Sequence, residues 1–135
     1  MGSNPLAGSM NYWNFLWVGM GGFLGSVFRY ATVKTIDATL QVFFPYGTLT
    51  VNVVGSFALG LLYPLVIKTG GLSESWRLFL GVGFCGGFTT FSAFAFENFI
   101  LLEQKQSPAM FLYALGSIFL GIISVFLGIW AGRQF

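Results

Sequence analysis

GVGFCGGFTTFSAFAFEN, residues 81–98, is the stretch that decides the fold of this chain. It lies within an apolar run long enough to cross a bilayer, yet its composition weakens a helix. Gly86 and Gly87 make the backbone flexible, since glycine inside a helix costs about 1 kcal/mol relative to alanine. Three hydroxyl residues follow, which can bond backbone groups freed by a helix break: Thr89, Thr90 and Ser92. Because irregular backbone survives in lipid only when buried in protein or lining a cavity, we predict a broken membrane helix with a functional site.

The composition is that of an integral membrane protein. Of the 135 residues, 56% are hydrophobic and only 7% are charged, whereas soluble domains have about 25% charged residues. The chain contains no histidine and one cysteine, which excludes an internal disulfide, His/Cys metal sites and a Ser-His-Asp triad. Its net charge of +2 comes from scattered basic residues, which argues against nucleic-acid binding. We therefore predict an all-α membrane protein that is not an enzyme.

The hydrophobic runs predict a single transmembrane domain over residues 10–135. We expect residues 1–9 to be the remnant of an expression tag, with Met10 as the natural start. A short connection is expected over residues 37–47, with Pro45 and Gly47 as helix breakers. Four membrane helices are predicted, and the third is longer than the ~20 residues that a straight helix needs: residues 12–36, 48–67, 75–102 and 108–131.

Small and polar residues recur along one face of several predicted helices. In the first span, the pairs Gly21/Gly25 and Gly22/Ser26 would let another helix approach closely. The second and fourth spans each carry a stripe at three- or four-residue spacing: Thr48, Asn52, Ser56 and Gly60, and then Tyr113, Ser117, Gly121, Ser124 and Gly128. Such stripes are often glue between helices, at roughly 0.6 kcal/mol per hydrogen bond. A complete polar stripe on the second span favours a lined pathway.

Two charged residues fall inside or near predicted spans. Arg29 lies on the same face as Gly22 and Gly25, so it either points into the protein or extends to the membrane surface. Glu97 is either a solvated charge near the end of the third span or a buried partner of Arg29.

The predicted loops give no orientation, because the basic residues are nearly balanced between the two sides. Such a protein can insert both ways and pair with its inverted copy. Four helices of this size enclose too little space for a pathway, so the polar stripes require a partner chain. A symmetric dimer is the simplest assembly that would enclose such a pathway.

Three motifs in this order resemble the Fluc (CrcB) family of fluoride channels: GSVFRY at 25–30, GTLTVNVVGSF at 47–57 and GGFTTFSAFAFEN at 86–98. The resemblance covers the chain from about Asn11 onward. It implies an antiparallel, dual-topology homodimer of four-helix subunits in the bacterial inner membrane, with the third helix broken at its centre. It also implies passive, fluoride-selective export through two pores per dimer, which relieves fluoride toxicity.

The resemblance assigns roles to single positions. A structural Na⁺ at the dimer centre would be held by the backbone carbonyls of Gly86 and Thr89. The fluoride pathway would include six residues: Asn52, Phe91, Phe94, Thr48, Ser117 and Tyr113. Arg29 and Glu97 match the family's charged positions at the vestibule and after the break. Gly121 departs from the family pattern, which has a further serine in the fourth-helix polar track, so that track is expected to be shorter or shifted here.

Two alternatives to the channel stay open at this stage. A small multidrug-type exporter also has four spans, but it needs a proton-binding carboxylate deep in the first span, and this chain has none there. A non-transporting subunit of a membrane complex would use the polar stripes only as glue. Fluoride is small and strongly hydrated, so its pathway must offer hydrogen-bond donors and weakly attractive ring edges, which Asn52, Phe91 and Phe94 would supply.

Overall fold

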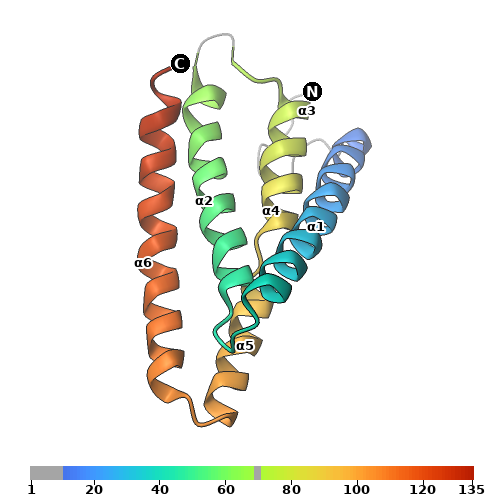
Figure 1. The fold of residues 1–135 in the computed structure, drawn as a ribbon. Coiled ribbons are helices and arrows are strands. Elements are labelled where there is room, and N and C mark those ends of the chain that lie inside the picture. The colour runs from blue at the N-terminus through green and yellow to red at the C-terminus, as the bar shows by residue number, and fades with distance from the viewer. Residues whose placement is uncertain (1–10, 69–70) are drawn as a thin grey trace.

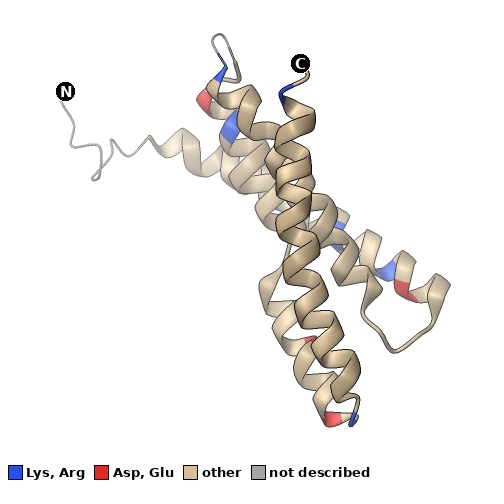
Figure 2. Ribbon diagram, turned by 90° about the vertical axis from the view of Figure 1, so that its left-hand side faces the viewer, with Lys and Arg blue, Asp and Glu red and all other residues tan. Residues whose placement is uncertain are grey.

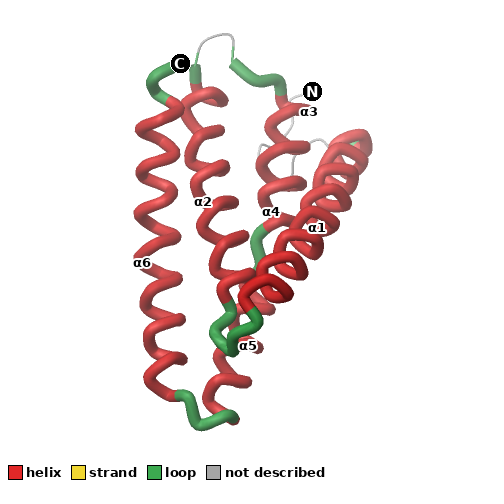
Figure 3. Tube along the Cα trace, viewed as in Figure 1, coloured by secondary structure: helices red, strands yellow, loops and turns green. Residues whose placement is uncertain are grey.

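The computed structural model describes residues 11–68 and 71–135, and all of the regular structure in them is helical. The expected tag remnant at residues 1–9 lies outside the described residues. Four long helical stretches run alternately down and up (Figures 1 and 3). They are α1 (Tyr12–Leu40), α2 (Tyr46–Ile67), a composite third stretch from Glu74 to Glu103, and α6 (Ser107–Gly132).

The third stretch consists of four pieces. It begins with α3 (Glu74–Arg77), continues as the π-helical segment η1 (Leu78–Cys85) and the short α4 (Gly86–Phe88), and resumes as α5 (Phe91–Glu103). Thr89 and Thr90 between α4 and α5 are extended, with ψ of 160° and 122°. The predicted helix break is thus confirmed, although Gly86 and Gly87 themselves stay helical. The π-helical turns were not predicted.

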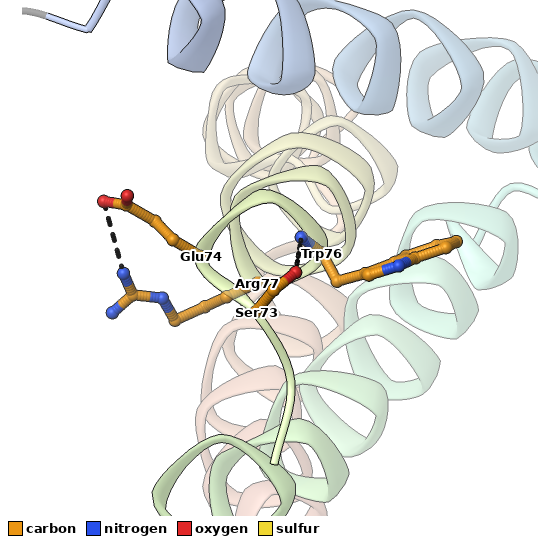
Figure 4. A network of polar contacts seen from close by, with 4 residues as sticks. All are labelled: Ser73, Glu74, Trp76 and Arg77. Carbon is orange, nitrogen blue, oxygen red and sulfur yellow. Dashed lines mark hydrogen bonds and ion pairs between the residues drawn. The ribbon is translucent and has the colours of Figure 1, made fainter. Parts of the chain in front are cut away.

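Side-chain caps fix several helix ends. The side chain of Asn11 accepts a hydrogen bond from the Trp13 N–H at 3.1 Å and begins α1. Ser73 accepts from the Trp76 N–H at 3.4 Å and begins α3, beside an exposed ion pair between Glu74 and Arg77 at 3.6 Å (Figure 4). Figure 2 shows basic residues near both ends of the molecule.

Helix α1 continues to Leu40, beyond the predicted end at residue 36, because nothing in residues 37–40 breaks a helix. Gln41, at φ 50°, ends it, and its N–H donates to the Asp37 carbonyl. Helix α2 begins two residues before its predicted start at 48. Gly47, predicted as a breaker, is helical and buried, and a Cβ there would lie 2.8 Å from Oδ1 of Asp37.

Glycines join the helices into two closely packed pairs. Helices α2 and α6 run in the same direction (Figure 1), and Gly60 faces the carbonyl of Val125 while Gly128 faces that of Phe57. Helix α1 lies parallel to the η1–α4 stretch, against which the predicted small-residue face packs. The backbone of Gly21 and Gly25 meets that of Phe79 and Phe84, and Gly22 meets Gly87. The predicted role of this face in helix packing is confirmed.

Within residues 11–68 and 71–135, three stretches are long and apolar enough to cross a membrane. They are α2, the composite stretch from Glu74 to Glu103, and α6. Helix α1, although 29 residues long, is not one of these three. Few side chains in the described part of the chain are fully buried, the largest being Tyr113, Leu101 and Val51. Most of its large apolar side chains are exposed, which suits a lipid environment or a second subunit.

Candidate functional site

The site is built around the extended residues Thr89 and Thr90. The Thr89 N–H donates to the Cys85 carbonyl at 3.0 Å, and its hydroxyl donates to the same oxygen at 2.9 Å. The Thr90 hydroxyl accepts from the Ala93 N–H at 3.1 Å and so caps α5. Hydroxyl side chains thus bond both helix ends at the break, as the sequence predicted.

Asn52 of α2 holds the break through two hydrogen bonds. Its Nδ2 donates to the Thr90 carbonyl at 3.1 Å, and its Oδ1 accepts from the Thr90 N–H at 2.8 Å. The side-chain amide therefore pairs with the backbone as a neighbouring strand would. One N–H of Nδ2 is left over, because an amide nitrogen has two hydrogens and one of them is used.

Arg29 of α1 contacts the break from another side. Its Nε donates to the Gly87 carbonyl at 2.9 Å, and the side chain is partly buried. Of the two orientations considered for Arg29, the structure shows the inward one. The hypothesis of an Arg29–Glu97 pair is wrong within this chain, since each group has other partners and, among the described residues, the side-chain ion pair joins Glu74 and Arg77.

A cavity of about 670 Å³ lies beside the break. Six residues predicted for the site line it: Asn52, Gly86, Thr89, Phe91, Phe94 and Ser117. Gly121 also lines it, and Ser56 of the α2 stripe lies opposite, with its Oγ 3.9 Å from where a Cβ on Gly121 would stand. The structure therefore brings most of the predicted pathway residues together in one cavity, along with Gly121, the residue that departs from the family pattern.

The cavity wall is apolar with a few polar groups. The rings of Phe91 and Phe94 lie 5.8 Å apart between centroids, and Phe91 is 78% exposed. Ser117 Oγ is buried and has no hydrogen-bond partner among the described residues. Among the residues that the structure describes, no carboxylate lines the cavity, and the one charged lining residue is Arg77. This set of groups suits a small anion better than a cation.

Three predicted residues form a separate network. The Thr48 hydroxyl donates to one carboxylate oxygen of Glu97 at 2.7 Å, and the Tyr113 hydroxyl donates to the other at 2.8 Å. Thr48 and Tyr113 are almost fully buried, and none of the three lines the cavity. The Tyr113 ring nevertheless lies 5.0 Å from that of Phe94, so the network adjoins the cavity through one aromatic contact.

Comparison with known proteins identifies the family of the chain. The family model described as "CrcB-like protein, Camphor Resistance (CrcB)" matches residues 16–129. The chain belongs to the CrcB-like family. A fluoride-specific ion channel FluC of Chlorobium chlorochromatii is 45% identical over 120 residues, covering 89% of this chain and 92% of that protein. FluC proteins of Thermus thermophilus and Flavobacterium psychrophilum are 46% and 41% identical over 84% and 87% of this chain, and over 89% and 95% of their own lengths.

Membership of the CrcB-like family confirms two predictions. These relatives are named ion channels, which agrees with the prediction that the chain is not an enzyme. Together with the three apolar membrane-crossing stretches, the family makes the chain a multi-pass protein of the bacterial membrane.

Sequence reasoning missed two features of this family member's site. Arg77 was not predicted for the site, yet it lines the cavity, as do Gly81 and Cys85. The four-residue spacing of these three was the available signal. The pairing of Asn52 with Thr90 was also missed, because it joins residues 38 positions apart and leaves no local pattern.

Proposed function

We propose that the chain is a passive, fluoride-selective ion channel that exports F⁻ across the membrane and relieves fluoride toxicity. Its relatives from three bacteria are named fluoride-specific ion channels. The observation that supports the proposal best is the cavity at the helix break, with hydrogen-bond donors and phenylalanine rings on its wall and no carboxylate.

The chemistry of the wall fits a strongly hydrated anion. An entering fluoride must exchange water for donors, and the spare N–H of Asn52 is one such donor. The Ser117 hydroxyl, which is buried and has no hydrogen-bond partner among the described residues, would become a second donor by rotating toward the cavity that its residue lines. The edges of Phe91 and Phe94 carry partial positive charge and attract an anion weakly. Weak attraction suits conduction, because an ion must leave as readily as it enters. Thr48 and Tyr113, whose hydroxyls donate to Glu97, would lie along the pathway beyond Phe94, which contacts the Tyr113 ring.

We further propose that residues 10–135 form one domain with α1 as a fourth span, and that two copies associate as an antiparallel homodimer with two pores. The cavity is open rather than enclosed, and Phe91 at its wall is largely exposed. A second copy would close it and cover the ring. Basic residues at both ends of the molecule permit either orientation in the membrane (Figure 2). Lipid would cover the remaining apolar surface.

A Na⁺ ion at the dimer centre is compatible with the residues present. The described residues contain no cluster of His, Cys, Asp or Glu that could hold a metal, so carbonyl oxygens are the available ligands. Outside the helical ladders, no hydrogen bond among the described residues uses the carbonyls of Gly86 or Thr89. Gly86 is exposed, with open space on the side where a Cβ would stand. Na⁺ bound there would supply fixed positive charge near the pathway.

Fluoride efflux from proteoliposomes, followed with an ion-selective electrode, tests the proposal, with chloride-loaded vesicles as the control. Rapid fluoride efflux with negligible chloride efflux is the expected result. A folded protein that passes no fluoride would support the non-transporting subunit instead. Proton-coupled efflux of organic cations would support the multidrug-type exporter, although the carboxylate of α1 is Asp37, close to the helix end rather than deep in it.

A further inference from the structure

The break is held by side chains from two different helices. Asn52 of α2 bonds the backbone of Thr90, and Arg29 of α1 bonds the carbonyl of Gly87. The two anchored residues are three positions apart, and the extended turn lies between them. Asn52 lines the cavity, whereas Arg29 does not. Asn52 can therefore both hold the break and contact an ion in the cavity, whereas Arg29 can act on the cavity only through the backbone that it binds.

The position of Arg29 on α1 explains how it reaches Gly87. Helical side chains lean toward the N-terminus of their helix. Gly22, two turns before Arg29 on the same face, lies against Gly87, where a Cβ would stand 2.7 Å from the Gly22 carbonyl oxygen. The Arg29 side chain thus leans toward the place where the break segment contacts α1. Its partner there is a neutral carbonyl, not a carboxylate.

The Gly87 carbonyl would ordinarily accept from the N–H four residues later, at Phe91. The extended backbone of Thr89 and Thr90 ends the helix before that bond forms, and the Arg29 Nε–H takes its place. Hydrogen bonds from charged groups contribute about 1.5–3 kcal/mol, more than neutral ones. A donor fixed at this carbonyl constrains the two adjacent peptide units, which carry the carbonyls of Gly86 and Phe88, and the carbonyl of Thr89 follows one unit later.

We infer that Arg29 is a positioning residue: its Nε–H fixes the Gly87 carbonyl and thereby orients the neighbouring carbonyls at the break. The link to ion conduction rests on the proposed function, but the anchoring itself does not. The competing reading is that Arg29 acts through its positive charge alone, by attracting anions toward the pathway. In the first explanation the Nε–H donor is essential, whereas in the second only the positive charge of the side chain is.

Two substitutions separate the donor from the charge. Arg29→Gln keeps a nitrogen donor at the ε position and removes the charge. Arg29→Lys keeps the charge, but it has carbon at the ε position and its nitrogen one atom further along. Arg29→Met removes both. We expect hydrogen–deuterium exchange in a peptide covering residues 86–95 to quicken on the order of tenfold in the Lys and Met variants. The Gln variant is expected to stay closer to the unsubstituted protein.

Fluoride efflux at varied Na⁺ concentration is the second measurement. We expect the Lys and Met variants to need more Na⁺ for half-maximal efflux, and the Gln variant to need about as much as the unsubstituted protein. Wild-type-like exchange in the Lys variant with fast exchange in the Gln variant would overturn the inference and support the charge reading. Unchanged exchange in all three, or failure of the Gln variant to assemble, would also overturn it. If the unsubstituted protein passes no fluoride, the proposed function fails, while the exchange data still decide the anchoring.

Discussion

Replacing Asn52 by Asp should abolish fluoride efflux while leaving the protein assembled. Aspartate has nearly the same shape, and one oxygen can still accept from the Thr90 N–H, now paired at 2.8 Å. The bond from Nδ2 to the Thr90 carbonyl is lost, and hydrogen bonds between membrane helices contribute about 0.6 kcal/mol on average and at most about 1.7. The second carboxylate oxygen would also face the Thr90 carbonyl oxygen, and two acceptors repel each other, so the side chain must turn slightly away from that carbonyl. We expect these costs to weaken the fold without destroying it.

The new charge has the larger effect on the ion. At an effective dielectric constant of about 20, the repulsion from the carboxylate raises the free energy of a fluoride about 4 Å away by about 4 kcal/mol. Since about 1.4 kcal/mol corresponds to a factor of ten, the efflux rate should fall roughly a thousandfold. An ion-selective electrode outside fluoride-loaded proteoliposomes would then record only the background leak.

Asn98→Asp is the matched control. Asn98 is also half-buried, and its amide donates to a backbone carbonyl, that of Phe94, at 2.8 Å. It does not line the cavity. The control should lose a similar hydrogen bond and keep efflux within about tenfold of the unsubstituted protein, by the same membrane hydrogen-bond energies. Both variants should elute as intact protein in gel filtration. Efflux by assembled Asn52→Asp protein at the unsubstituted rate would move the pathway away from this cavity.

Three further experiments address the ring edges, the glycine packing and the cation. Phe91→Ile and Phe94→Ile should each slow fluoride efflux without loss of assembly, because the ring edges disappear; normal efflux in both would exclude that role. Gly25→Ala should destabilise the protein by about 1–3 kcal/mol, because the added Cβ overlaps the Phe84 carbonyl. Gly19→Ala, with open space at that position, is its control, and thermal unfolding in detergent is the measurement; equal midpoints would contradict the packing argument. Preparation in Na⁺-free N-methylglucamine buffer should abolish efflux, which added Na⁺ should restore; full activity without Na⁺ would remove the cation from the proposal.

The break illustrates what local sequence could predict. The glycines and hydroxyl residues at 86–92 located it within a few residues, because flexible backbone and short-range hydroxyl bonds are local effects. The sequence could not show that Gly86 and Gly87 remain helical while Thr89 and Thr90 become extended. That outcome depends on Asn52, which bonds Thr90 from another helix.

Charged groups were harder to place than packing faces. The small residues on α1 were correctly predicted to contact another helix, since their spacing alone defines a face. Arg29 and Glu97 were considered as a pair because opposite charges in an apolar environment favour each other. Each instead found neutral partners: a backbone carbonyl for Arg29, and two hydroxyls for Glu97. Nothing in a single sequence distinguishes these solutions, since all of them satisfy a buried charge.

The π-helical segment η1 places an unusual demand on chain length. Its hydrogen bonds reach five residues back rather than four, so it accommodates more residues per turn than an α-helix does. Removing one residue between Leu78 and Cys85 while the rest of the segment stays π-helical would rotate everything after it, so Gly87 would turn away from α1 and Thr90 from α2. A deletion that converts one π-helical turn into an α-helical turn would instead leave the following residues in nearly the same register, because the π-helical turn holds the extra residue. Changes in residue number within this segment are therefore tolerated only when the helix type changes with them, and other insertions or deletions should accumulate in the loops before Ser73 and after Glu103.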